Sequence, residues 1–333
     1  MCLTAAYGIG VDWTDLPLAR ATVDRAADRR TRPGLVADLL ADDATRVLLV
    51  RAGLVATTSA RAGLALDLLA PSVVAPSAVG RPGVLADRWL YLGTEGATSY
   101  LGLVLTEPPA PILDAEGFAI DGGTDLVAGR EWSHLRTIGA ALSARDAGLA
   151  TTAVALAAWH ETHQRCPRCG SVTDVVQAGW VRRCSADTSE HYPRTDPAVI
   201  MAVVDDADRL LLGHSAQWPE RRVSTLAGFV EPGEAIEHAV RREVAEEVDI
   251  VVGDVSYRGS QPWPFPASLM LAFRARAITT QITVDGVEIT AARWFTRAEL
   301  ADGLAAGEVL LPMRASIARV LIEEWFGDEL PGE

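Results

Sequence analysis

The segment from Gly228 to Ile250, GFVEPGEAIEHAVRREVAEEVDI, constrains this chain more than any other part of its sequence. Glu243, Glu246 and Glu247 stand at i, i+3 and i+4, and on a helix these positions share one face. Carboxylates crowded in this way repel each other, and a divalent cation such as Mg²⁺, which binds oxygen ligands, removes the repulsion. The segment therefore predicts a helix that holds a divalent cation beside a glycine turn, which suits the cleavage of a phosphoanhydride.

Length, net charge and the absence of lysine limit the class of protein. The chain has 333 residues, of which 49% are apolar, and this length indicates two or three domains. A net charge of −14 disfavours a general nucleic-acid binder, which needs a basic surface. Every basic residue is an arginine, so mechanisms that require a lysine nucleophile or a Walker lysine are excluded.

The cellular compartment is inferred from three further features. No apolar run approaches the length of a membrane span, so we expect no membrane segment. The first residues, MCLTAAYGIGVDWTDLPLAR, lack the basic start and apolar stretch of a secretory signal. Three of the four cysteines are clustered, unlike a disulfide framework, and a reducing cytoplasm fits this pattern best.

The first 130 or so residues contain no catalytic cluster. Up to about residue 130, the runs RVLLVRAG, DRWLYLGTE and SYLGLVLTE predict strands of a mixed sheet separated by Gly/Pro turns. We interpret this region as a scaffold or assembly domain, because it lacks His, Cys and carboxylates at ligand spacing. Residues 131–163 are rich in Ala and Leu, and Gly148 predicts a break into two helices joined by a short turn.

The second half of the chain predicts an α/β sandwich. The runs AVIMAVVDD and RLLLGHSA predict two strands around an Asp-rich turn, and the glutamate-bearing helix follows. Further strands are expected at about 268–275 and 291–295, and a last helix from about Arg314 to Trp325. Strands and helices that alternate around a mixed sheet are typical of this layout.

A small cysteine-bearing module lies between the two halves. Cys166-Pro-Arg-Cys169-Gly has the sequence of a zinc knuckle, and Cys184 follows at the spacing of a zinc ribbon. The fourth ligand position is open between Asp187, which keeps the CxxC register, and His191, which is the more usual partner for three thiolates. The Zn²⁺ would be structural; the alternative is a ribbon that keeps its fold without metal.

A segment of prolines and aromatic residues follows the glutamate helix. Residues 260–268 read SQPWPFPAS, and this composition predicts a fixed and largely unpaired backbone. Beside a helix that cleaves diphosphates, it predicts a rigid wall with aromatic faces for a planar base. The alternative is a packed aromatic loop with no ligand.

The glutamate segment resembles the Nudix box, Gly-x5-Glu-x7-Arg-Glu-U-x-Glu-Glu-x-Gly-U, in which U is a bulky aliphatic residue. Asp249 replaces the second glycine, and aspartate can adopt the positive-φ exit from a helix at some cost. The sequence SQPWPFPxS downstream of the box, with a zinc ribbon upstream, resembles the NADH pyrophosphatases (NADH diphosphatases) of the Nudix superfamily. The box matches at Gly228, Glu234, Arg242, Glu243, Val244, Glu246, Glu247 and Ile250.

The resemblance implies a fold class and a domain order. The expected fold is a Nudix α/β/α sandwich with a mixed sheet, preceded by a small zinc ribbon and an N-terminal mixed α/β domain. The expected parts are a Nudix-like scaffold or dimerisation domain (1–130), a helical linker (131–163), the ribbon (164–194) and the catalytic domain (195–333).

The resemblance also implies which residues bind metal. Glu243, Glu247 and the backbone carbonyl at Ala227 would hold Mg²⁺ or Mn²⁺. Glu246 belongs to the same cluster and would act as a ligand or orient water. A further ligand is expected on a later loop, where Glu288 in VDGVEIT is the counterpart.

A second implied set binds the dinucleotide. Phe229 matches an aromatic residue that stacks on the nicotinamide end, and Ala318 matches a small residue that contacts the substrate. Tyr192 matches an aromatic residue that reaches the substrate from the partner subunit of a homodimer. The wall of the site is matched by Gln261, Pro262, Trp263, Pro264, Phe265, Pro266, Ala267 and Ser268.

The implied activity is hydrolysis of the pyrophosphate of NADH or NAD⁺ to NMN(H) and AMP, and the resemblance also raises removal of the NAD cap from RNA 5′ ends. Two other classes stay open. A Nudix hydrolase for ADP-ribose or another dinucleotide would keep the box without needing the aromatic segment. A non-catalytic nucleotide sensor would have no use for so many like charges.

Overall fold

The computed structural model describes residues 10–60, 63–78, 88–105, 112–113, 119–120 and 126–332. These residues form two compact units. The N-terminal unit comprises residues 20–195 and 264–267, and the C-terminal unit comprises residues 10–19, 196–263 and 268–332. Residues 10–19, which we grouped with the N-terminal domain, thus pack in the C-terminal unit, where Leu16 joins the core. Within the described chain, no helix is both long and apolar enough to cross a bilayer.

The N-terminal unit is built on a mixed sheet, as predicted. Its strand order is β3-β2-β1-β6-β5, in which β1 pairs with β6 in parallel and the other pairs of this path are antiparallel. The three runs singled out in the sequence form β1, β5 and β6. The strands of the path are β1 (Arg46–Arg51), β2 (Leu54–Ala60), β3 (Gly63–Leu66), β5 (Trp89–Glu95) and β6 (Thr98–Leu105).

Shorter elements complete this unit. The two-residue strand β4 (Leu68–Leu69) pairs with β1, and β9 (Glu131–His134) pairs with β2. Strands β7 (Ile112–Leu113) and β8 (Ala119–Ile120) pair with each other. Leu residues of α1 and Val74 of α2 join an apolar core with side chains of β1, β5 and β6. The helices before residue 130 are η1 (Ala27–Thr31), α1 (Leu35–Leu40) and α2 (Pro71–Ala78).

The expected break at Gly148 is wrong. Strand β9 is followed by the short helix α3 (Leu135–Ile138), and α4 (Ala144–Thr162) then runs through Gly148 without interruption. Ser143 caps α4 by accepting a hydrogen bond from the amide of Asp146 at 3.2 Å. Gly148 has a packing role instead, because a Cβ there would lie 2.7 Å from the Cβ of Ala21. One interior glycine costs a helix only about 1 kcal/mol, so close packing overrides the local signal.

The cysteine-bearing module folds as three short antiparallel strands in the order β10-β11-β12. Arg182 is buried and joins this module to α4, since its Nε donates to Thr173 Oγ1 at 2.7 Å and its Nη1 lies 3.0 Å from His160 Nδ1. The elements are β10 (Thr173–Val176), η3 (Gln177–Gly179), β11 (Val181–Cys184) and β12 (Glu190–His191).

The C-terminal unit contains a second mixed sheet with the order β16-β17-β13-β14-β18, and β15 pairs with β13. The predicted strands of the second half form β13, β14, β17 and β18. Strands β13 and β17 are parallel, with Asp196 opposite Ser268 and Val204 opposite Arg276. The strands are β13 (Asp196–Val204), β14 (Leu210–Ser215), β15 (Leu226–Phe229), β16 (Val252–Trp263), β17 (Ser268–Ala277) and β18 (Ile289–Phe295).

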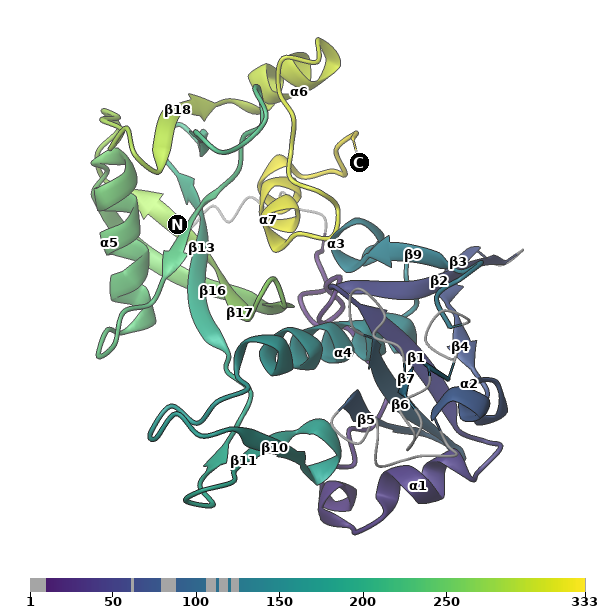
Figure 1. The fold of residues 1–333 in the computed structure, drawn as a ribbon. Helices are drawn as coiled ribbons and strands as arrows, with labels where there is room; N and C mark the ends of the chain where they lie inside the picture. The colour runs from purple at the N-terminus through teal and green to yellow at the C-terminus, as the bar shows by residue number, and fades with distance from the viewer. Residues whose placement is uncertain are drawn as a thin grey trace. The chain divides into compact units, whose positions relative to one another are not determined.

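Helices cover both faces of this sheet, as Figure 1 shows. Successive β13 side chains alternate between the faces: Val199, Met201 and Val203 pack with the apolar side of α5 (Ile236–Val248). Ile200, Ala202 and Val204 face the core that includes α7 (Ile317–Phe326). Helix α6 (Arg297–Ala305) begins with a capping box between Thr296 and Glu299. This is the predicted α/β/α sandwich.

The segment SQPWPFPAS does not have the unpaired backbone that its prolines suggested. Gln261, Pro262 and Trp263 end strand β16 and lie opposite Met270, Leu269 and Ser268 of β17. Only residues 264–267 form the turn of the hairpin. Strand β16 is the outer strand of its sheet, and proline is tolerated in an outer strand because no further strand needs its missing N–H.

Candidate active site

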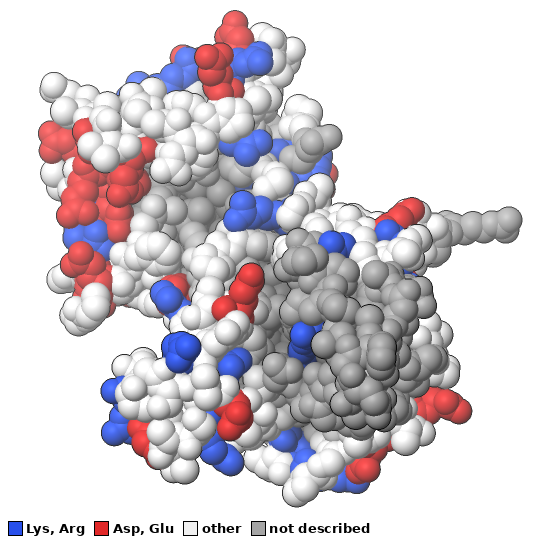
Figure 2. Space-filling view, in the orientation of Figure 1, with Lys and Arg blue, Asp and Glu red and all other residues white. Residues whose placement is uncertain are grey.

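Helix α5 buries two of its three box glutamates because of where its apolar side chains stand. Val240, Val244 and Val248 are fully buried against the sheet. Glu243 and Glu247 stand three and seven residues after Val240, so they fall on the same stripe, and both are buried. Glu246 lies off the stripe, and 61% of its side chain is exposed. Figure 2 shows the acidic residues gathered over α5.

Because Gly228 has no side chain, the carboxylate of Glu243 can occupy the space beside it. A Cβ at Gly228, in β15, would lie 2.0 to 2.2 Å from three carboxyl atoms of Glu243, so any other residue would displace that side chain. The box glycine therefore allows strand β15 and helix α5 to approach closely. Ala227 is the preceding residue of the same strand. Asp249 takes the other glycine position and ends α5 with φ 58° and ψ 31°, the left-handed exit expected from the sequence.

Arg242 fixes the loop before α5. Its Nε and Nη2 each donate to Glu234 at 2.8 Å, and Nη2 also donates to the carbonyl of Phe229 at 2.9 Å. Its Nη1 donates to Glu243 at 2.8 Å and to Glu246 at 3.0 Å. The Arg242 guanidinium holds the pKa of Glu234 at about 2, well below its usual range. One arginine thus orients three carboxylates.

Glu247 is surrounded by apolar atoms and by other acids. Burial, and then the charges of Glu243, Glu288 and Asp285, raise its pKa to about 8. Its Oε2 atom is buried, with no hydrogen-bond partner in the described part of the chain. A buried carboxylate oxygen left in this way is costly to the fold, and it is the kind of atom that a cation would satisfy.

The loop before β18 brings a further carboxylate to this helix. Asp285 accepts hydrogen bonds from the backbone amides of Glu288 and Ile289 at 2.9 Å, and its own amide donates to the carbonyl of Glu247 at 3.1 Å. These bonds tie the loop to the end of α5. Asp285 was not predicted as a site residue, although an aspartate directly before Gly286 is a recognisable turn signal.

A pocket of about 300 Å³ opens beside these carboxylates. Its lining includes Ala227, Glu247 and Glu288 from the metal set, and Trp263 and Ala318 from the predicted dinucleotide set. Several other lining residues were not predicted from the sequence. Among these, Thr225 has a buried hydroxyl without a hydrogen-bond partner within the described residues. The other unpredicted polar or aromatic lining residues are Ser215, Trp218, Ser224 and Ser316.

Gln261 lines this pocket, yet its side chain is fully buried and bonded to the protein itself. Its Nε2 donates to the carbonyl of Ala315 at 2.9 Å and to that of Pro17, and its Oε1 accepts from the amide of Ile317 at 2.9 Å. The amide group therefore joins β16, the start of α7 and residues 10–19.

The remaining predicted substrate residues are distributed over both units. In the C-terminal unit, Phe229 is 60% exposed, while Pro262 and Ser268 are half-buried at the end of the hairpin. Tyr192 belongs to the N-terminal unit and is 64% exposed. The turn residues Pro264, Phe265, Pro266 and Ala267 also belong to that unit, where Arg136 lies 4.7 Å from the centre of the Phe265 ring.

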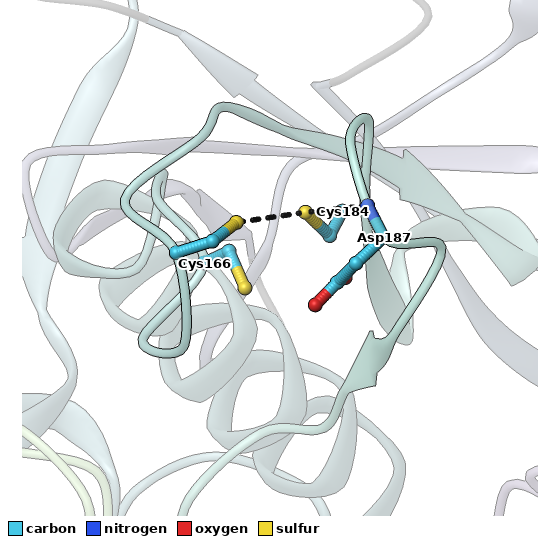
Figure 3. Close-up of side chains that lie close together, drawn as sticks. Cys166, Cys184 and Asp187 are labelled. Atoms are coloured by element: carbon cyan, nitrogen blue, oxygen red, sulfur yellow. Dashed lines mark hydrogen bonds between the residues drawn. The ribbon is translucent and has the colours of Figure 1, made fainter.

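The three clustered cysteines meet one carboxylate. The Sγ atoms of Cys166, Cys169 and Cys184 and a carboxylate oxygen of Asp187 all lie within 4.8 Å of one another. Figure 3 shows the side chains of Cys166, Cys184 and Asp187 converging from the two loops of the ribbon. His191 instead places its Nε2 3.3 Å from the hydroxyl of Ser189. Three sulfurs and one oxygen at this spacing fit the tetrahedral shell of a structural Zn²⁺.

The chemistry of the α5 site also fits a metal. Glu243 and Glu247, whose pKa values are raised by burial and by neighbouring acids, form an oxygen donor set beside an open pocket, and the Oε2 of Glu247 is unsatisfied among the described residues. Hard divalent cations prefer such donors. With Trp263 and Trp218 in the pocket wall, the site can accept both a diphosphate and an attached ring system.

Comparisons with known proteins agree with this geometry. Three family models match: the NUDIX domain over residues 194–318, the NADH pyrophosphatase zinc ribbon domain over 161–192, and the NADH pyrophosphatase-like rudimentary NUDIX domain over 39–159. The chain is 44% identical over 200 residues to the "NAD-capped RNA hydrolase NudC" of Mycobacterium bovis, and this match covers 57% of this chain and 64% of that protein.

Two further similarities come from more distant sources. The chain is 42% identical over 196 residues to the human "NAD-capped RNA hydrolase NUDT12", covering 55% of this chain and 42% of that protein. A NUDIX hydrolase crystal structure from Nitrosomonas europaea has a TM-score of 0.38 at 20% identity, covering 50% of this chain and 94% of that one.

Proposed function

This chain belongs to the NADH pyrophosphatase family of Nudix hydrolases, and from that premise we propose that it hydrolyses the pyrophosphate bond of NADH or NAD⁺ to NMN(H) and AMP. We extend the proposal to removal of the NAD cap from RNA 5′ ends, because the named relatives are NAD-capped RNA hydrolases. The observation that carries the proposal is the buried, unsatisfied carboxylate of Glu247 at a pocket with aromatic walls.

Four residues are assigned to metal binding, and a fifth, Glu246, to the metal or the attacking water. Glu243, Glu247, Glu288 and the carbonyl of Ala227 would hold Mg²⁺ or Mn²⁺. When bound, the ion neutralises the diphosphate and lowers the pKa of a coordinated water. Arg242 holds Glu246 at 3.0 Å on the exposed side of the cluster, and we assign Glu246 to ligation or to orienting and deprotonating the attacking water.

The bases would be held by aromatic and small side chains. The exposed Phe229 ring follows Gly228 directly and offers a face to the nicotinamide. Trp263 lines the pocket wall, and the buried Ala318 leaves room at the start of α7. Gln261 has both amide atoms occupied by backbone partners, so it would shape the pocket without contacting substrate.

We also propose the remaining features implied by the family. The three cysteines and Asp187 would bind one structural Zn²⁺, because they are the ligands that the fold brings together. The protein would act in the cytoplasm as a homodimer in which Tyr192 reaches the partner's site. The large exposed area of the Tyr192 ring supports such a contact.

One assay tests the activity directly. Pure protein with Mg²⁺ is incubated with NADH, NAD⁺, ADP-ribose or NAD-capped RNA, and the products are identified by mass spectrometry. We expect NMN(H) and AMP, with a higher kcat/KM for NADH than for ADP-ribose. A preference for ADP-ribose would favour another Nudix hydrolase, and binding without turnover would favour a nucleotide sensor.

A further inference from the structure

A second pocket, of about 510 Å³, lies wholly within the N-terminal unit. Residues 30–37, at the end of η1 and in α1, form one wall, and residues 175–179 of β10 and η3 form another. Arg30, Arg32 and Arg183 line it together with Trp89. Apolar side chains of Leu35, Val36, Val175 and Val176 make up much of the remaining lining.

Among the residues that the structure describes, two of the three arginines at this pocket pair with a carboxylate, and the third does not. Arg32 pairs with Asp38 at 2.5 Å, and Arg183 pairs with Glu190 at 2.7 Å. Arg30, by contrast, forms no ion pair with a carboxylate of the described residues; its guanidinium carbon lies 3.5 Å from the centre of the Trp180 ring. Burial and the neighbouring charge of Arg25 lower the pKa of Arg30. In a chain of net charge −14, such a cation is an unusual feature.

Two residues that line this pocket each carry a buried hydrogen-bond donor without a partner among the described residues. The Nε1 of Trp89 and the Nε of Arg30 are buried, and no acceptor of the described chain reaches them. Trp89 is only 2% exposed, so its N–H gains little from water. A buried donor without an acceptor is costly, and a bound ligand with acceptor atoms would remove the cost.

We propose that this pocket binds a nucleoside monophosphate, with its phosphate at Arg30 and its base and sugar against the apolar wall. Stacking on Trp180 occupies the face of the guanidinium, and its Nη2 donates to the carbonyl of Arg25 at 3.4 Å, so the phosphate would be bound by the N–H groups that remain. The pocket is far larger than an inorganic phosphate requires, and apolar walls with a few polar groups are typical of small-molecule sites. The proposal does not depend on the catalytic activity.

Hydrogen–deuterium exchange on the full-length protein locates the binding. We expect AMP to protect peptides that cover residues 29–40 and 175–184, whereas adenosine and inorganic phosphate protect them far less. Peptides covering 226–247 report binding at the catalytic pocket separately. Protection by inorganic phosphate equal to that by AMP would overturn the assignment to a nucleotide, and no protection of either peptide would overturn the site.

Substitution tests the role of the arginine. Arg30→Gln should weaken AMP binding in these peptides at least tenfold, roughly the loss of one charge-assisted contact. Arg276→Gln, an exposed arginine of the C-terminal unit, should leave it unchanged. Trp89→Phe should weaken binding about threefold, and circular dichroism confirms that each variant is folded. Unaltered AMP affinity in folded Arg30→Gln would refute the proposal. NADH turnover should persist in Arg30→Gln, so the proposed activity is judged separately.

Discussion

The carboxyl group of Glu247 stands in surroundings that oppose its ionisation. It occupies the apolar stripe of α5 between side chains that pack on the sheet, and the charges of four other acids act on it. Its burial follows from a spacing that the sequence contains: Val240, Glu243, Val244, Glu247 and Val248 share one face of a helix. This spacing explains why Glu243 and Glu247 turn inward, although only the structure shows that Glu246 lies off this face and bonds to Arg242.

Replacing that carboxylate should separate catalysis from folding. We predict that Glu247→Gln lowers kcat for NADH by at least about 10³-fold, because a ligand to the metal is lost. The metal-free variant should be no less stable than the parent, since the substitution removes repulsion among buried acids. Steady-state kinetics and thermal melts measure both. Glu237→Gln, exposed on the same helix, serves as the control, and substantial activity of Glu247→Gln with Mg²⁺ would contradict the assignment.

The pKa of Glu247 also predicts a link between pH and metal. Its value in the fold, about 8, lies above the ordinary 4.5, so its contribution to the stability of the metal-free protein is full below pH 4.5 and is lost as pH rises through 8. Mg²⁺ should offset this loss. We expect the increase in Tm on adding Mg²⁺ to be larger at about pH 8.5 than at about pH 6. Glu247→Gln should flatten this difference, and an equal increase at both pH values in the parent would count against the prediction.

Among the elements, β16 and the start of α7 are joined by the side-chain amide of Gln261. Gln261 joins them to residues 10–19 through the carbonyls of Ala315 and Pro17 and the amide of Ile317. The segment also packs there through Trp13, whose ring would be 2.7 Å from a Cβ at Gly259. The contacts of residues 10–19 with Gln261 and Gly259 are not visible in the sequence, because they join positions more than 200 residues apart.

Removing that amide should therefore destabilise the C-terminal unit. We predict that Gln261→Ala costs about 2–4 kcal/mol of unfolding free energy, because three backbone groups, two of them in buried hydrogen bonds, lose their partner. Urea denaturation monitored by circular dichroism measures this cost. Gln217→Ala, at an exposed turn, should change stability by less than about 0.5 kcal/mol. A similar small effect for Gln261→Ala would show that water replaces the lost contacts.

In the ribbon, the open choice of fourth ligand can be tested with matched variants. We expect Asp187→Ala to weaken Zn²⁺ binding by about 10- to 100-fold. His191→Ala should leave the affinity unchanged, since its imidazole faces Ser189. Asp187→Cys should bind Zn²⁺ more tightly, as a fourth thiolate completes a common structural site. Competition with a chromophoric chelator gives the affinities, and the reverse order for Asp187 and His191 would assign the ligand to histidine.

Across the whole molecule, local patterns were informative where one element satisfies them and failed where distant segments meet. Three strands of the N-terminal sheet (β1, β5, β6), four of the C-terminal sheet (β13, β14, β17, β18) and the last helix were predicted from apolar runs, and the family match confirms the overall architecture. The helix break predicted at Gly148 was wrong because the residue that requires a glycine there, Ala21, is remote in the chain. The prolines of residues 260–268 misled because strand pairing at a sheet edge accommodates them. Thr225, Trp218 and Asp285 became site residues only once the strands were assembled.

The proposed assembly makes a prediction about subunit exchange. If Tyr192 acts on the partner's site, Tyr192→Ala and Glu247→Gln should each be weakly active alone, yet mixed dimers contain one intact site. Random mixing in equal amounts then restores about a quarter of the parental activity. The protein should elute at about twice its 35.5 kDa mass in light scattering. Mixing without recovery, or a monomeric mass, would place Tyr192 outside any shared site.

Strand β16 has one more consequence, for the behaviour of the protein in a crowded cell. Outer strands expose backbone groups onto which a foreign strand can add, and this is how ordered aggregates grow. Pro262 has no N–H to offer such a strand, and the register of β16 is irregular between Val252 and Val255 and again between Tyr257 and Gly259. Irregular pairing and a proline both interrupt the flat edge that fibril growth requires. The hairpin beside the pocket thereby also protects the sheet against self-association.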